Sequence, residues 1–242
     1  MRLRGILNAR LFILFIVSVI PTTAFSEFLK VPNIQEEMSK IHNIGLLPLD
    51  IQMMEIFPGD LVEPREDWAI QAKETTQALL SDYFSQSSYQ LKSIDLSGQE
   101  SQVDEIMYLY KRVAATLNAG VMDQFSAISL PGRKDNFDYS LGDLSFLFDH
   151  RDVDAVLIVI GADAYLSTSR KVSESASAVV KLVFGVVDFA NPQGTITMAL
   201  VNKNGAILWH SSQTMGGTDF RDNNVHQYIM TNVLNSFPKA PQ

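Results

Sequence analysis

The chain of 242 residues contains no cysteine. This absence excludes disulfide bonds, thiolate metal ligands and cysteine nucleophiles. It also excludes the lipid attachment of bacterial lipoproteins, because that attachment uses a cysteine just after the signal peptide. We therefore expect no lipid anchor at that position.

Histidine is scarce, and the four histidines (His42, His150, His210 and His226) have no spacing that would form a metal site. The chain also lacks an HExxH motif and a glycine-rich phosphate loop. We therefore predict neither a bound metal ion nor a cofactor. His210 follows Trp209 at the end of a predicted hairpin arm, where we expect an exposed histidine at the rim of the sheet.

The first 26 residues have the order of a secretory signal peptide. Arg2, Arg4 and Arg10 form a basic end, Leu11 to Ile20 an apolar core, and Ala24 to Ser26 offers small residues for the peptidase. The apolar core is about half the 20 residues that a membrane span needs. We predict cleavage between Ser26 and Glu27, a periplasmic mature protein and no transmembrane helix in it.

The formal net charge is −8, and it becomes −11 when the signal peptide takes away its three arginines and no acid. An acidic protein repels phosphate backbones, which argues against a nucleic acid as partner. We expect an envelope protein or a second copy of the chain instead.

The apolar patterns predict alternating strands and helices after a polar lead-in at 27–39. The single domain is expected to cover 40–238, with a tail at 239–242. Strands are expected at 40–49, 90–96, 155–160, 179–190 and 195–201, and a turn at 202–205 leads into a hairpin arm at 206–214. Helices are expected from about 64 to 83, at 103–117, after Ser140, and at 225–237 before Pro238.

This order predicts an α/β fold, because continuous apolar strands between amphipathic helices form a sheet that is covered on both faces. The late hairpin is antiparallel, so the sheet is mixed, and a C-terminal helix closes the domain.

The stretch from Ala155 to Ile160 is apolar without alternation, which predicts a central strand. Gly161 is expected to let the chain leave the sheet, so that Asp163 lies where solvent begins. A second apolar run, Val179 to Ala190, contains Lys181 and is expected to be an edge strand, which could pair with another chain.

Three residues are candidates for a binding site: Asp163, Asp219 and Arg221. Ligands of open α/β sheets gather beyond the carboxyl ends of strands, where Asp163 is expected. Asp219 and Arg221 precede the last helix, after the Gly216-Gly217 pair, which would let a backbone approach closely. The other interpretation is local, since aspartates also end strands and cap helices. We identify no catalytic residue.

Four motifs are similar to those of known proteins: Tyr139 to Gly142 (YSLG), DAVLIVIGADAY, the hairpin that contains Trp209, and Asp219-Phe220-Arg221. In these motifs the chain resembles a group of uncharacterised exported envelope proteins of Gram-negative bacteria. Its order of elements is similar to the small α/β periplasmic domains of curli-export subunits and to the amino-terminal domain of the Tol propeller protein. The resemblance implies a role in the envelope and assigns no enzymatic residue.

Three functions stay open at this point. The first is a non-catalytic periplasmic module that binds or scaffolds another envelope component. The second is a hydrolase that uses Asp163 and the Gly216–Arg221 loop. The third is an oligomerising accessory of an export system, pairing through the Val179 strand. The lack of any nucleophile–base spacing favours binding over catalysis.

Overall fold

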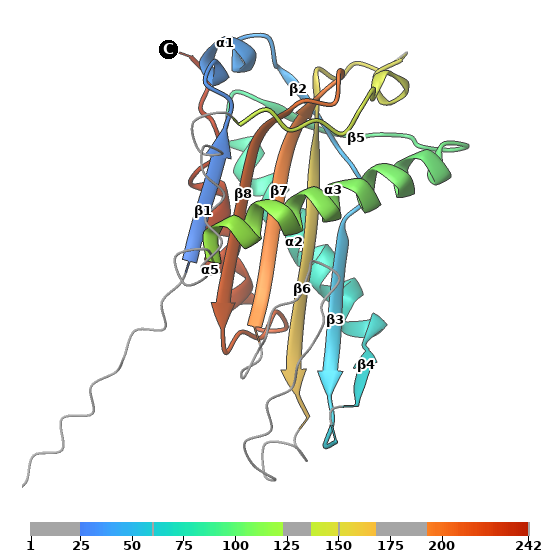
Figure 1. Cartoon of the computed structure of the whole chain (residues 1–242), viewed down its shortest axis with the longest axis vertical. Coiled ribbons are helices and arrows are strands. Elements are labelled where there is room, and N and C mark those ends of the chain that lie inside the picture. The colour runs from blue at the N-terminus through green and yellow to red at the C-terminus, as the bar shows by residue number, and fades with distance from the viewer. Residues whose placement is uncertain (1–24, 60, 123–136, 150, 168–192, 242) are drawn as a thin grey trace, which may run out of the picture.

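The computed structural model describes residues 25–59, 61–122, 137–149, 151–167 and 193–241. Within these residues an eight-stranded mixed sheet forms the centre of the molecule. Helix α3 (Glu100–Met122) crosses one face of the sheet, while α2 (Glu66–Ser85) and α5 (Asn223–Leu234) cover the other (Figure 1). The predicted α/β fold with helices on both faces is confirmed.

Three strands are long: β6 (Ala155–Leu166), β7 (Gln193–Asn202) and β8 (Ile207–Gly216). The other strands are shorter: β1 (Phe25–Lys30), β2 (Asn43–Leu46), β3 (Asp50–Ile56), β4 (Val62–Pro64) and β5 (Gln90–Ser93). The short helices are α1 (Ile34–Met38) and the 3-10 helix η1 (Ser145–Leu147).

The strand order is β1-β8-β7-β6-β2-β5. Strand β3 pairs with the later part of β6, after the residues that pair with β2, and β4 pairs with β3. Strand β6 pairs in parallel with β2 and β3 and antiparallel with β7. The β7–β8 hairpin turns at Gly205, which has a φ of 78°. Glycine adopts this left-handed conformation without steric cost, so the sequence suits the turn.

Strand β6 is the central strand that its apolar sequence predicts, and it is buried from Ala155 to Ala164. Leu157 and Val159 join the core under α2 and α5, whereas Val156, Ile158 and Ile160 join the core under α3. Because both faces are covered by helices, neither face needs polar residues. The strand does not end at Gly161, as the sequence suggested, but continues to Leu166.

The expectation of an exposed His210 is wrong. The side chain is buried under α3, where its Nδ1 lies 3.1 Å from the Tyr110 hydroxyl and its Nε2 lies 3.3 Å from Asn118 Oδ1. Burial lowers the pKa of His210 to about 3, so the imidazole is neutral. Helix α3 crosses this end of β8, and the hairpin pattern alone did not indicate that cover.

Two segments differ from the predicted pattern at the start of the domain. The lead-in at 27–39 contains most of β1, which pairs antiparallel with β8, and the whole of α1. The strand expected at 40–49 is the shorter β2, and a second strand that was not expected, β3, begins at Asp50 after Pro48. The Val179 to Ala190 run lies outside the described residues.

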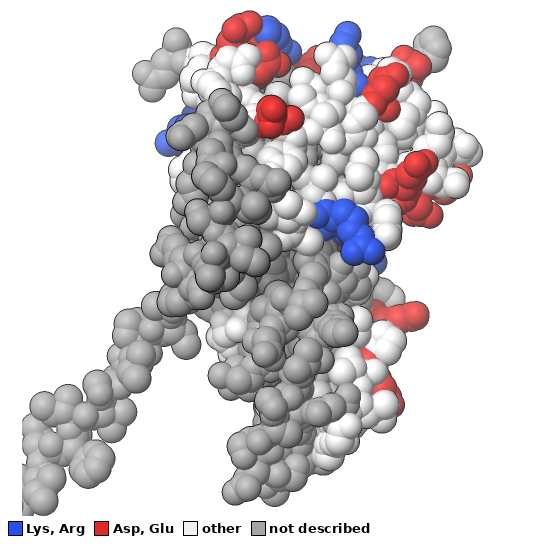
Figure 2. Space-filling model, viewed as in Figure 1, with Lys and Arg blue, Asp and Glu red and all other residues white. Residues whose placement is uncertain are grey.

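None of the described helices is both long enough and apolar enough to cross a membrane. Figure 2 shows the face that α3 crosses, and in its described part several separate groups of acidic side chains and a few basic ones lie among uncharged residues. This face also carries the half-exposed Tyr108 and Leu109 on α3.

Candidate functional site

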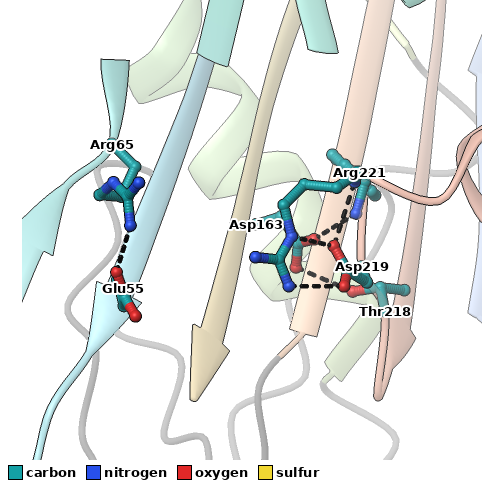
Figure 3. A network of polar contacts seen from close by, with 7 residues as sticks. Glu55, Arg65, Asp163, Thr218, Asp219 and Arg221 are labelled. Atoms are coloured by element: carbon teal, nitrogen blue, oxygen red, sulfur yellow. Dashed lines mark hydrogen bonds and ion pairs between the residues drawn. The ribbon is translucent and has the colours of Figure 1, made fainter. Parts of the chain in front are cut away.

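Asp163 lies inside β6 and is fully buried, which corrects the expectation that it lies where solvent begins. Its Oδ1 accepts a hydrogen bond from the Thr218 hydroxyl at 2.9 Å, and its Oδ2 accepts one from the Phe220 backbone N–H at 2.8 Å. The carboxylate therefore attaches the loop between β8 and α5 to the central strand (Figure 3).

Gly194 makes room for this loop. It pairs with Asp163 across the β6–β7 ladder. A Cβ at Gly194 would lie 2.5 Å from Thr218 Oγ1 and 2.6 Å from the Phe220 ring, and real Cβ atoms do not approach other atoms so closely. The missing side chain is what lets the loop reach the carboxylate.

The Phe220 side chain continues the attachment into the core between α2 and α5. Its ring stacks on the His226 ring, with 4.8 Å between centroids, and His226 Nε2 lies 2.9 Å from Thr76 Oγ1. Burial lowers the pKa of His226 to about 4, so this histidine is also neutral. Loop, α5 and α2 thus form one packed unit around Phe220.

The loop presents Asp219 and Arg221 on the outside of that unit. Arg221 Nε and Nη2 donate to the two carboxylate oxygens of Asp219, each at 2.7 Å. The pKa of Arg221 is raised, and the hydrogen bonds to Asp219 are the largest cause. The guanidinium carbon of Arg221 lies 3.8 Å from the Tyr165 ring centroid and 4.2 Å from the Trp68 ring centroid.

A second arginine covers Trp68 as well, with the Arg65 guanidinium carbon 3.9 Å from the ring centroid. Arg65 is itself held by Glu55 on β3 (Figure 3). Asp67 accepts two further hydrogen bonds from the Arg65 guanidinium. We call Arg65, Trp68, Tyr165 and Arg221 the arginine–aromatic cluster. Its members come from the end of β6, the start of α2 and the loop before α5, and the ion pair with Glu55 connects Arg65 to the end of β3.

The structure thus brings the three predicted site residues together, but in two different roles. Asp163 is buried and attaches the loop, while Asp219 and Arg221 belong to the surface above it. The sequence pattern gives no signal for Arg65, Trp68 and Tyr165 as members of a site. Trp68 lies in a segment whose period predicts only a helix, and Tyr165 lies beyond the point where the strand is expected to end.

The contacts of these groups are unsuited to hydrolysis. Asp163 has no exposed surface, and both of its oxygens accept hydrogen bonds from the loop. The Asp219 carboxylate is held by two nitrogens of Arg221. A general base has to reach the proton that it removes, and neither carboxylate is presented in that way. Within the described ranges, no three histidine or acidic side chains gather where they could hold a metal ion.

The pKa of Asp163 is raised to about 6, mainly by burial. The folded state therefore favours the protonated acid, and this contribution to stability is present below pH 3.8 and lost as the pH rises through 6. An Asp163→Asn variant lacks this contribution. We expect its deficit in unfolding free energy relative to the wild type to be larger at pH 4 than at pH 7, by about 2 kcal/mol. Urea unfolding of both proteins at several pH values measures this; a deficit that does not change with pH would contradict the raised pKa.

No family model matches the chain, and no curated protein matches it. Solved structures of the PelC dodecamer from Paraburkholderia phytofirmans align with it in two crystal forms, in space groups P6 and C2. Both have a TM-score of 0.36, at 12% and 11% identity, and the alignments cover 91% of this chain and 100% of theirs. A likeness at this TM-score carries no argument about function. The resemblance to exported envelope proteins stays a prediction.

Proposed function

We propose that the chain is a non-catalytic periplasmic protein of the cell envelope that binds another protein through the arginine–aromatic cluster. The observation that carries the proposal is the stack itself, in which two guanidinium groups cover one indole and one of them also covers a phenol ring. Tryptophan, tyrosine and arginine are the residue types that dominate the binding energy of protein interfaces.

The cluster is accessible and held in place at the same time. The side chains of Arg65 and Arg221 are 32% and 27% exposed, and Trp68 and Tyr165 are partly buried. Each guanidinium donates to a carboxylate two residues away in the sequence, Arg65 to Asp67 and Arg221 to Asp219. A surface whose side chains are already ordered loses less entropy on binding, which favours recognition.

The periplasmic location rests on the order of the first 26 residues, which is typical of a cleaved signal peptide. Protein isolated from the periplasm is expected to begin at Glu27. Of the other two functions, the hydrolase has less support, because its carboxylates already accept hydrogen bonds: Asp163 from the loop and Asp219 from Arg221. The oligomerising accessory depends on the Val179 strand, which the structure does not describe.

We expect a photo-crosslinking amino acid at position 63 to capture a specific envelope protein in living cells. Glu63 is exposed and lies opposite Glu55, the partner of Arg65, in the β3–β4 ladder. The same amino acid at position 108, which is exposed on α3 across the sheet, is the matched control. A product that forms from position 63 and not from position 108 supports the cluster as the docking surface. Equal products from both positions, or none from position 63, would contradict it.

A further inference from the structure

The surface around the arginine–aromatic cluster carries more carboxylates than guanidinium groups. Arg65 pairs with Glu55 and Asp67, and Arg221 pairs with Asp219. The two positive charges of the cluster are therefore neutralised within it, and they offer little attraction to an acidic partner. The charges that remain at this surface come from acidic residues beside the cluster.

Three exposed carboxylates lie next to residues of the cluster: Glu63 on β4, Glu66 in the first turn of α2, and Asp222 at the N-cap of α5. Glu63 lies directly opposite Glu55 in the β3–β4 ladder, and like charges in this position repel each other. Among the described residues, none of the ion pairs includes any of the three. Their negative charges are therefore available to a partner.

Basic residues are scarce on the elements that meet at the cluster. Strands β3, β4 and β6 and helix α5 contain no lysine or arginine. Helix α2 contains Lys73, about two turns beyond Glu66. The amino-terminal ends of α2 and α5 add roughly half a positive charge each, which offsets only part of the carboxylates. The described part of this surface therefore has an excess of negative charge, which attracts a cationic partner.

An exposed apolar side chain lies among these carboxylates. Ile70 is 58% exposed on α2. Residues three and four apart on a helix lie on the same side, so Ile70 lies beside Asp67 and Glu66. Trp68 provides further apolar surface at the start of the same helix. A partner that covers this surface gains most when it combines basic side chains with an apolar one.

We propose that the partner of the arginine–aromatic cluster presents a basic segment that contains an apolar side chain. Its lysine or arginine side chains lie against Glu63, Glu66 and Asp222, and its apolar side chain packs on Ile70 and Trp68. This inference rests on the proposed function, because it specifies the chemistry of the partner that the cluster binds.

Fluorescence anisotropy with three labelled peptides tests the chemistry of the partner. Each peptide has a pair of leucines, flanked by lysines in the first, by glutamates in the second and by glutamines in the third. We expect the lysine peptide to bind the mature protein at least about tenfold more tightly than the glutamine peptide, and the glutamate peptide to bind more weakly than both. The preference is expected to shrink when the ionic strength rises from about 10 mM to about 100 mM, because the screening length falls from about 30 Å to about 10 Å. Equal binding of the three peptides would overturn the proposal.

Two pairs of substitutions show whether the lysine peptide binds at the cluster. Glu63→Gln with Glu66→Gln removes two of the acidic side chains beside it. Asp104→Asn with Glu105→Gln removes the same charge from exposed positions on α3, across the sheet. We expect the first pair to weaken binding about tenfold and the second pair to leave it nearly unchanged. Equal effects of the two pairs would mean that the peptide responds only to net charge, and would overturn the assignment.

Charge reversal tests the same inference on the natural partner. In the protein that carries the photo-crosslinking amino acid at position 63, Glu66→Lys is expected to lower the yield of the crosslinked product about tenfold, and Asp104→Lys to leave it unchanged. A thermal melt checks that both variants stay folded. An undiminished yield from folded Glu66→Lys protein would overturn the basic partner while the proposed function stands. If no product forms from position 63 in the parent protein, the proposed function itself fails, and this inference fails with it.

Discussion

Replacing Ile158 by aspartate is expected to prevent folding. The side chain is fully buried in the middle of β6, in the core under α3. The variant loses roughly 1.5–3 kcal/mol of apolar burial and also places a carboxyl group without a partner in a dry core. Together these terms reach the size of a typical domain's whole stability, about 5–15 kcal/mol. Circular dichroism and a thermal melt of the purified variant measure the outcome.

Ile70→Asp is the matched control, because Ile70 is 58% exposed on α2. A surface substitution of this kind is expected to change the unfolding free energy by about 0.5 kcal/mol or less. A folded Ile158→Asp protein with a cooperative melt would contradict the central position of β6 and the division of the core into two layers around it.

Replacing Asp163 by alanine is expected to lower the unfolding free energy by about 2–6 kcal/mol. The Thr218 hydroxyl and the Phe220 N–H lose their acceptor in a buried place, and each unpaired donor costs roughly 1–3 kcal/mol. Asp163→Asn is expected to cost less at neutral pH, since an amide can accept from Phe220 and donate to the Thr218 oxygen. Urea unfolding at pH 7 compares the two variants. Equal, small losses would show that the loop does not depend on this carboxylate.

The main features of the fold follow from local patterns that the sequence displays. The unbroken apolar run from Ala155 to Ile160 predicts a strand with two buried faces, and β6 has them. The turn residues Asn202 to Gly205 predict the hairpin, and Gly205 has the φ that such a turn requires. These features depend on neighbouring residues, so periodicity and turn chemistry are sufficient to identify them.

The site could be predicted only in part, because its geometry depends on contacts between distant segments. An aspartate after an apolar run predicts the edge of a sheet, but Asp163 is buried by donors from Thr218 and Phe220, more than fifty residues away. The space for them comes from Gly194 on another strand. Likewise, nothing near Trp68 in the sequence shows that Arg221 covers it. Pairings of this kind require the tertiary structure.

The Trp68→Ala substitution tests most directly the proposal that the arginine–aromatic cluster binds a protein partner. The measurement is the yield of the crosslinked product from position 63, in the wild type and in the variant, together with the melting temperature of both. We expect the variant to stay folded and the yield to fall about tenfold or more, as for an interface residue that dominates the binding energy. An undiminished yield from a folded Trp68→Ala protein would contradict the claim.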